Sequence, residues 1–186
     1  MPDFMLELAK GRRSIRKYTE EPIAEETLDA ILKTALLAPS SWGEKVVEFV
    51  VVEDKEVLRD LARCKRIGAL SVRDATVAVV VIVDRDRSKL WIEDGAVAAT
   101  YLLLAAEYHG IGACWNHIRG REGQNASSEK EIQKLLGIPE KYGVLCVVAM
   151  GHKDENKAAY TDADIPLQNI HRGTFHSVTS QRRNHK

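Results

Sequence analysis

Three polar residues near the amino terminus, Arg12, Ser14 and Arg16, alternate along the chain with Arg13 and Ile15. In an extended segment alternate residues lie on one face, so two guanidinium groups would flank one hydroxyl while Ile15 anchors the segment in the core. Arginine binds phosphate oxygens in a bidentate way, and the pattern therefore indicates a phosphate site. A solvated basic stretch with a few surface ion pairs, or an arm that binds nucleic acid, would show the same spacing.

A second group of small residues, Pro39-Ser40-Ser41-Trp42-Gly43, directly follows an amphipathic helix. Small hydroxyl side chains and exposed backbone amides allow close approach to a planar heterocycle, which Trp42 could flank or stack on. A plain loop that ends the helix and places Trp42 in the core is the alternative.

The third group, Gly112-Ala113-Cys114-Trp115-Asn116-His117-Ile118, follows a long apolar helix. Backbone N–H groups at the end of a strand here could donate to a ring nitrogen. A lone histidine such as His117 is more often a packed or surface residue than a catalyst. We expect Cys114, between apolar neighbours, to be an inert core thiol.

The chain lacks the motifs of several common catalytic classes. It contains no H-E-x-x-H, no Cys-x-x-Cys, no phosphate-binding G-x-x-x-x-G-K-S/T and no Gly-x-Ser-x-Gly elbow. Gly110-Ile111-Gly112 begins like a dinucleotide fingerprint, but Trp115 replaces the third glycine and the segment follows a helix. The six histidines do not cluster, so no metal site is expected. Any chemistry should then come from a bound cofactor, with no side chain as catalytic acid or base.

The elements that would position these groups alternate between helices and strands. Apolar residues at helical spacing, early glutamates and Pro39 predict a helix over 24–37. Strands rich in β-branched or apolar residues are predicted over 46–52, 76–83, 113–118 and 144–150. Further helices are predicted over 4–10, 54–63, 88–109 and 129–136. The helix over 88–109 is apolar nearly all round, so we expect it to be buried, between subunits. Few of the connections between successive predicted strands have the length of a regular helical crossover, which favours a layered α+β sheet over a doubly wound one.

Length and composition are those of an ordinary globular protein. The 186 residues suit one domain, 1–175, followed by a frayed polar tail, 176–186. Lysine plus arginine equals aspartate plus glutamate at 27 each, so charge suggests neither a nucleic-acid nor a membrane partner. Three distant cysteines and a start without an apolar leader indicate a cytoplasmic protein. The longest nearly apolar run, 96–106, is well short of the ~20 residues that span a bilayer.

Taken together and in this order, three motifs resemble those of the nitroreductase family of FMN-dependent oxidoreductases. They are R-R-S-I-R-K-Y, A-P-S-S-W-G and I-E-D-G-A-V-A-A-T-Y-L-L-L-A-A-E-Y-H-G-I-G-A-C-W. The resemblance covers about residues 5–175. It implies a three-layer α+β fold with a mostly antiparallel central sheet flanked by helices, and a homodimer with FMN at the interface. It also implies that NAD(P)H reduces the flavin, which then reduces a small acceptor such as a nitroaromatic or quinone by a ping-pong mechanism.

The resemblance also assigns cofactor contacts to the residues that match the family's motifs. The phosphate and ribityl contacts are Arg12, Arg13, Ser14 and Arg16, and Arg172 matches a further basic residue near the phosphate. The loop that borders the ring from the partner chain is Pro39, Ser40, Ser41 and Gly43. The backbone around His117 and Ile118 would donate to flavin N5.

The sequence departs from the family's pattern on the ring side. Gly43 and Lys45-Val46-Val47 stand where many members have Asn and Gln-Pro-Trp, so hydrogen bonds to the ring's polar edge are lost or are replaced by Lys45. Asn116-His117-Ile118 stands where many have Ile-Gly-Gly, and the bulkier residues could narrow the pocket. FMN binding is thus better supported than any substrate. A flavin-binding carrier or sensor with little turnover is the alternative.

Overall fold

Four runs of mainly apolar residues form one antiparallel sheet in the computed structural model of the chain, which describes residues 3–175. The strands are β1 (Val47–Val52), β2 (Val77–Asp84), β3 (Ile111–His117) and β4 (Tyr142–His152). Their order in the sheet is β1-β2-β4-β3. The central strands β2 and β4 are buried along nearly their whole length, as their unbroken apolar runs predict. The tail predicted over 176–186 lies outside the described residues.

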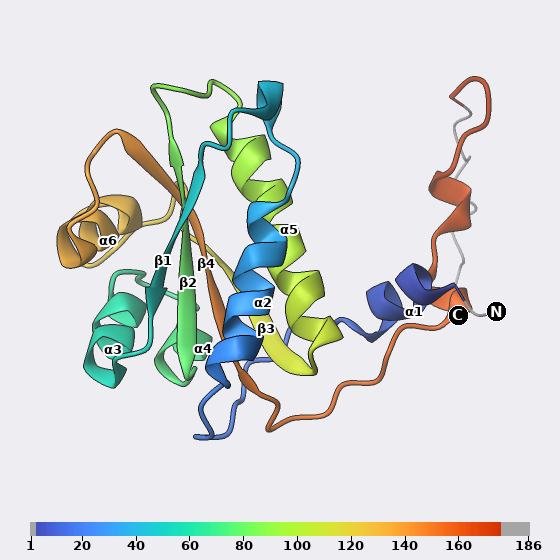
Figure 1. Cartoon of the computed structure of the whole chain (residues 1–186), viewed down its shortest axis with the longest axis horizontal. Helices are drawn as coiled ribbons and strands as arrows, with labels where there is room; N and C mark the ends of the chain where they lie inside the picture. Colours follow the sequence, from blue (N-terminus) through green and yellow to red (C-terminus); the bar gives the residue numbers. More distant parts are fainter. Residues whose placement is uncertain (1–2, 176–186) are drawn as a thin grey trace, which may run out of the picture.

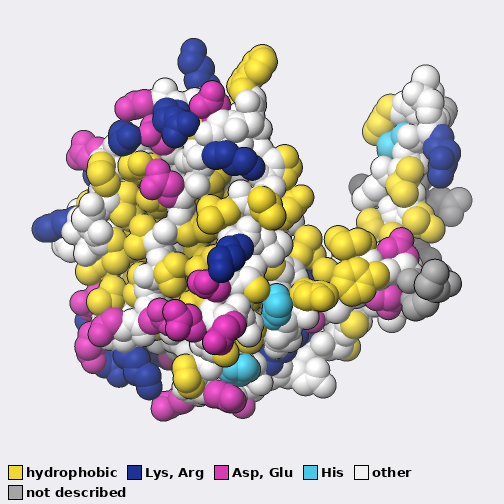
Figure 2. Space-filling view, in the orientation of Figure 1, with side chains coloured by type: hydrophobic (Ala, Val, Ile, Leu, Met, Phe, Trp, Pro, Cys, Tyr) yellow, Lys and Arg dark blue, Asp and Glu magenta, His cyan; other side chains and the backbone are white. Residues whose placement is uncertain are grey.

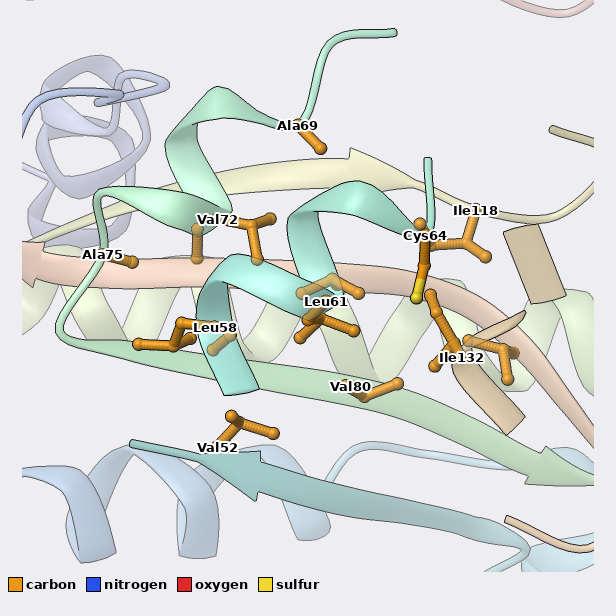
Figure 3. Packing of buried hydrophobic residues seen from close by; sticks show 14 of the residues in the cluster. Val52, Leu58, Leu61, Cys64, Ala69, Val72, Ala75, Val80, Ile118 and Ile132 are labelled. Atoms are coloured by element: carbon orange, nitrogen blue, oxygen red, sulfur yellow. The ribbon is translucent and has the colours of Figure 1, made fainter. Parts of the chain in front are cut away.

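Helices cover both faces of this sheet and give the molecule three layers (Figure 1). One face carries α2 (Glu25–Leu36) and α5 (Trp91–Tyr108), and the other carries α3 (Lys55–Arg63), α4 (Leu70–Arg73) and α6 (Ser128–Leu136). Side chains of β2 alternate between the two cores, Val79 toward α2 and α5 and Val80 toward the other helices. Figure 3 shows Leu58, Leu61 and Ile132 packed on that second side. The predicted three-layer α+β fold is confirmed.

Helix α1 (Phe4–Gly11) and the chain after β4 leave this body together. The Tyr160 N–H donates to the Lys10 carbonyl oxygen at 3.0 Å, and the Lys10 ammonium pairs with Asp162 at 2.7 Å. Beyond this point residues 160–175, which we call the arm, contain two 3-10 turns, Asp162–Asp164 and Leu167–Asn169. The arm stands away from the sheet (Figure 1), and Figure 2 shows apolar side chains where it joins the body.

Most elements begin and end within two residues of their predicted bounds, and two differ more. Helix α5 begins at Trp91 instead of residue 88, because Ser88 is held in a turn: its N–H donates to the Asp84 carbonyl oxygen at 3.1 Å and its hydroxyl to Asp94 at 2.7 Å. Helix α4 was not predicted, since four residues without a side-chain cap leave no periodic signal. None of the helices in residues 3–175 has the length and hydropathy to cross a membrane.

Candidate functional site

Residues 12–16 run beside the open edge of β3, the strand whose other edge pairs with β4. The Ile15 N–H donates to the Ala113 carbonyl oxygen at 3.0 Å, and Ser14 forms an isolated parallel bridge with Ala113. Gly112 permits this approach, because a Cβ there would lie 2.8 Å from Cγ2 of Ile15. Ile15 is 3% exposed, which confirms its predicted role as the anchor. The polar residues of the segment are therefore presented at the edge of the sheet.

The three arginines of this segment have different surroundings. Arg13 donates to the Ala158 carbonyl oxygen and lies 4.3 Å from the centre of the Tyr160 ring, so it holds the chain after β4. The Arg16 guanidinium reaches a carbonyl oxygen of its own segment at 3.4 Å. Within residues 3–175 the Arg12 guanidinium forms no hydrogen bond or ion pair. Arg12 and Arg16 thus remain available to an anion, whereas Arg13 has a structural contact.

The backbone of the arginine segment is also held by Glu155 and Lys157, two residues that the sequence did not identify. Lys157 donates to the Ser14 carbonyl oxygen and pairs with Glu155 at 3.1 Å. Glu155 accepts the backbone N–H of Arg16 at 2.5 Å, and this bond lowers the pKa of the Glu155 carboxyl below its ordinary value, with Lys157 adding to the effect. The polar sequence after β4 has no spacing that would single these residues out. Together they fix the backbone of the arginine segment.

The serine loop, residues 39–43, is fixed to the start of α5 by a buried carboxylate. Asp94 is 4% exposed and accepts both the backbone N–H of Ser41 at 2.7 Å and its hydroxyl at 2.8 Å. The other carboxylate oxygen accepts the Ser88 hydroxyl at 2.7 Å. Ser40 is held separately, since its hydroxyl accepts the Lys45 N–H at 3.2 Å. Asp94 shares the first turn of α5 with Glu93, and an acidic residue there is common enough to carry no signal for this role.

The outer turn of the serine loop has an unusual backbone and an exposed tryptophan. Trp42 has φ +56° and Lys45 has φ +49°, both in the left-handed region that costs a residue with a Cβ roughly 1–3 kcal/mol. The Trp42 side chain is 96% exposed, so it does not belong to the core of this chain. Such strain occurs mostly where surrounding contacts fix a functional geometry. The loop therefore holds Trp42 at the surface, which differs from the alternative of a plain helix-ending loop with Trp42 in the core.

The strand end at His117 and Ile118 has two kinds of backbone amide. The N–H groups of Ile118 and Arg119 both donate to the Leu145 carbonyl oxygen, at 3.0 and 3.1 Å, beside a bulge where β4 shifts register against β2. In an antiparallel pair, the N–H and C=O of one residue point the same way. The Ala113 carbonyl faces residues 12–16, so His117, four residues on, also faces away from β4. The N–H of His117, not that of Ile118, is presented at the open edge.

The His117 imidazole is half-buried and stacks on Trp115, with ring centres 6.4 Å apart and planes at 13°. Burial lowers the pKa of His117 below its ordinary value, and the cations Arg121, Lys65 and Arg119 lower it further. The neutral imidazole is therefore favoured at neutral pH. Cys114 is buried, as predicted, and all three cysteines are free.

The arginine segment and the serine loop lie at opposite ends of α5 in one chain. Ser41 binds Asp94 in the first turn of α5, whereas a Cβ at Gly11, next to Arg12, would lie 3.4 Å from Glu107 in the last turn. With 18 residues, α5 is about 27 Å long. One chain therefore does not bring these two parts of the predicted site together.

Arg172 lies on the arm and is exposed. Among the described residues no contact joins it to residues 12–16, and its carbonyl oxygen accepts the Thr174 N–H at 3.1 Å. The structure of one chain thus leaves the predicted phosphate contact of Arg172 unformed.

The fold and the site define a class: an α+β protein with a helix-covered antiparallel sheet and a row of arginines along one sheet edge. Comparison with known proteins gives the family. The family model described as the nitroreductase family matches residues 9–80 and 64–152. The chain belongs to the nitroreductase family.

Relatives of the chain match it over most of its length. A protein of Archaeoglobus fulgidus with the provisional name NADH dehydrogenase/NAD(P)H nitroreductase is 37% identical over 172 residues, which cover 90% of this chain and 96% of that protein. FMN reductase (NAD(P)H) of Bacillus subtilis is 31% identical, covering 78% of this chain and 64% of the relative. The solved structure of an FMN-dependent nitroreductase from Clostridium difficile has 42% identity and a TM-score of 0.89, covering 92% of this chain and all of that one.

Proposed function

We propose that the chain is an FMN-dependent NAD(P)H oxidoreductase that works as a homodimer. The names of the Bacillus and Clostridium relatives support FMN as the cofactor. The observation that carries the proposal is the free Arg12 guanidinium beside the open edge of β3, a place where an anion would gain a partner without displacing one. Arg12, Ser14 and Arg16 would hold the phosphate, with Arg13 fixing the segment behind them.

The residues of β3 fit the other end of the same cofactor. His117 is four residues after Ala113, which lies beside Ser14. An extended strand covers about 13 Å over four residue steps. The phosphate, ribityl chain and ring edge of FMN, with a hydrogen bond at each end, can together bridge such a span. The N–H of His117 would then donate to flavin N5, because the N–H of Ile118 is already bonded to Leu145. This refines the assignment made from the motif.

A second copy of the chain would supply the rest of the site. The points on α5 that hold the serine loop and lie beside Gly11, Asp94 and Glu107, are about 20 Å apart along the helix. The loop residues Pro39, Ser40, Ser41 and Gly43 would therefore border the ring from the partner. Exposed apolar side chains agree with a large interface. They include Phe4, Met5, Leu37, Trp42, Tyr108, Leu167 and Ile170. The arm would place Arg172 on the partner, where it could reach the second phosphate site.

FMN, when bound, supplies the chemistry of taking a hydride from NAD(P)H and passing electrons to a small acceptor such as a nitroaromatic or quinone, in a ping-pong sequence. The chain's own residues bind, orient and shield. The N–H of His117 would favour negative charge on the ring. No side chain acts as catalytic acid or base in this proposal, which agrees with the missing catalytic motifs.

Replacement of Arg12 by alanine tests the phosphate assignment. A hydrogen bond to a charged group contributes about 1.5–3 kcal/mol, so the Kd for FMN should rise about tenfold to a hundredfold. The matched control is Arg63→Ala, because Arg63 lies on α3 and pairs with Asp60 at 2.8 Å. Titration of FMN into apoprotein, followed by flavin fluorescence, gives both constants. An unchanged Kd in Arg12→Ala would contradict the assignment.

Turnover separates the enzyme from a flavin carrier or sensor. The FMN-loaded wild-type protein should oxidise NADH or NADPH steadily when a quinone or nitroarene is added. Protein that binds FMN but oxidises neither nucleotide with any of these acceptors would instead support a flavin carrier or sensor.

A further inference from the structure

Four cations lie in two loops beside the end of β3, and none of them is assigned to the proposed flavin site. Lys65 and Arg66 follow α3, and Arg119 and Arg121 follow β3; we call these four residues the basic rim. The loops are joined, because the Arg66 N–H donates to the Glu122 carbonyl oxygen at 3.0 Å. Figure 3 shows Cys64 and Ile118, the neighbours of Lys65 and His117, side by side in the core beneath.

An open cavity of about 500 Å³ lies within the basic rim. It is lined by Lys65, Arg66, Ile67, Arg121 and Glu122. This volume is large enough for a small aromatic molecule or for the charged end of a larger one. Two of the cations that line it, Lys65 and Arg121, lower the pKa of the His117 imidazole, so the cavity lies near the end of β3 that the proposed flavin ring would occupy.

The basic rim has more positive charge than its surroundings balance. Within residues 3–175 none of its four cations forms an ion pair, although Arg119 lies 6.0 Å from the centre of the Trp91 ring. By contrast, Arg63 and Arg59, about one and two turns earlier, each pair with a carboxylate of α3. Glu122 is the one acid that lines the cavity. Lys65 and Arg121 line the same cavity; burial lowers the pKa of Lys65, and the like charge of Arg121 lowers it further. The chain as a whole has no net charge, yet cations without an ion-pair partner are concentrated in the basic rim.

We propose that the basic rim binds an anionic group, a carboxylate, sulfonate or phosphate, of a substrate of the reaction, and so selects charged over neutral substrates. This inference rests on the proposed function, because the cavity adjoins the flavin site only if FMN binds along β3. Two substrates could bring the anion: an acceptor with an acidic substituent, or NADPH with its additional phosphate. An anion between Lys65 and Arg121 would relieve their repulsion, and this is the gain that a neutral substrate lacks.

The test compares matched pairs of substrates on the FMN-loaded protein. The double variant Lys65→Gln/Arg121→Gln removes two charges of the basic rim, and the control Lys33→Gln/Lys134→Gln removes two exposed charges on α2 and α6. If the acceptor brings the anion, kcat/KM for 4-nitrobenzoate should fall about tenfold in the double variant, and that for 4-nitrobenzamide less than about twofold. If NADPH brings it, kcat/KM for NADPH should fall by the same factor and that for NADH should not. Equal changes for the charged and neutral member of both pairs would overturn the proposal.

A direct binding measurement keeps this inference separate from the proposed function. Addition of 4-nitrobenzoate should shift the NMR signals of the His117 ring, assigned with His117→Gln, in the wild type and the control but not in the double variant. This result would support the basic rim even in a protein that failed to turn over. Turnover without any such shift, and without charge preference, would refute the basic rim and leave the oxidoreductase intact.

Discussion

Replacement of Asp94 by alanine should loosen the serine loop, although Asp94 is not itself assigned as a cofactor contact. The carboxylate is 4% exposed and accepts three hydrogen bonds, two from Ser41 and one from Ser88, at 2.7–2.8 Å. Hydrogen bonds to charged groups contribute about 1.5–3 kcal/mol each, but burial of an ion without a paired cation offsets part of that sum. We expect a net loss of about 3 kcal/mol in the free energy of unfolding.

For a domain of this length such a loss corresponds to a fall of about 6–12 °C in Tm, which thermal unfolding monitored by circular dichroism can measure. The Kd for FMN should rise as well, because Ser41 loses its support. Asp94→Asn is the matched variant: its amide oxygen can still accept from Ser41, and the Ser88 hydroxyl can turn to accept from the new NH₂ group. It should therefore lose less than half as much stability. If Asp94→Ala equals the wild type in both Tm and FMN affinity, the reasoning about this loop is wrong.

Three further predictions follow from other contacts. Gly112→Val should displace residues 12–16, because its Cβ would lie 2.8 Å from Ile15; differential scanning calorimetry should show a loss of about 1–3 kcal/mol, and FMN should bind more weakly. Lys141 donates to Asp84 at 2.7 Å and lowers the pKa of that carboxyl, so Lys141→Met should lower Tm at neutral pH. Because the Asp84 pKa is depressed in the folded state, this difference should shrink as the pH falls through the ordinary aspartate value of about 3.9 and vanish only below the depressed pKa of the folded protein. Burial raises the pKa of Cys64 to about 11, so this thiol should stay unreactive toward a disulfide reagent at about pH 8 until the protein is unfolded.

The sequence was most informative where side chains alternate or recur with a clear period. The apolar runs of β2 and β4 predicted strands buried on both faces, and the Ile15 anchor followed from alternation along residues 12–16. The helix predicted to end at residue 109 ends at Tyr108, and Gly110 follows it with φ +75°. These features depend on local pattern alone, which one sequence contains in full.

Features that depend on contacts between distant residues were not predictable in this way. Nothing local links Glu155 to the Arg16 backbone, 139 residues earlier. The register shift that leaves the Leu145 carbonyl oxygen to accept from Ile118 arises only when β4 pairs with β2. Sequence motifs therefore indicated the strand end as a candidate but did not distinguish the bonded N–H of Ile118 from the open one of His117.

The central claim is that an FMN held along β3 exchanges electrons with NAD(P)H. The most direct measurement is the visible absorption spectrum of the purified protein, loaded with FMN and mixed with NADH or NADPH without oxygen. Our account predicts that flavin stays with the protein on gel filtration, that its oxidised band bleaches, and that a quinone restores the band. Protein that retains no FMN, or bound flavin that both nucleotides leave oxidised, would contradict it.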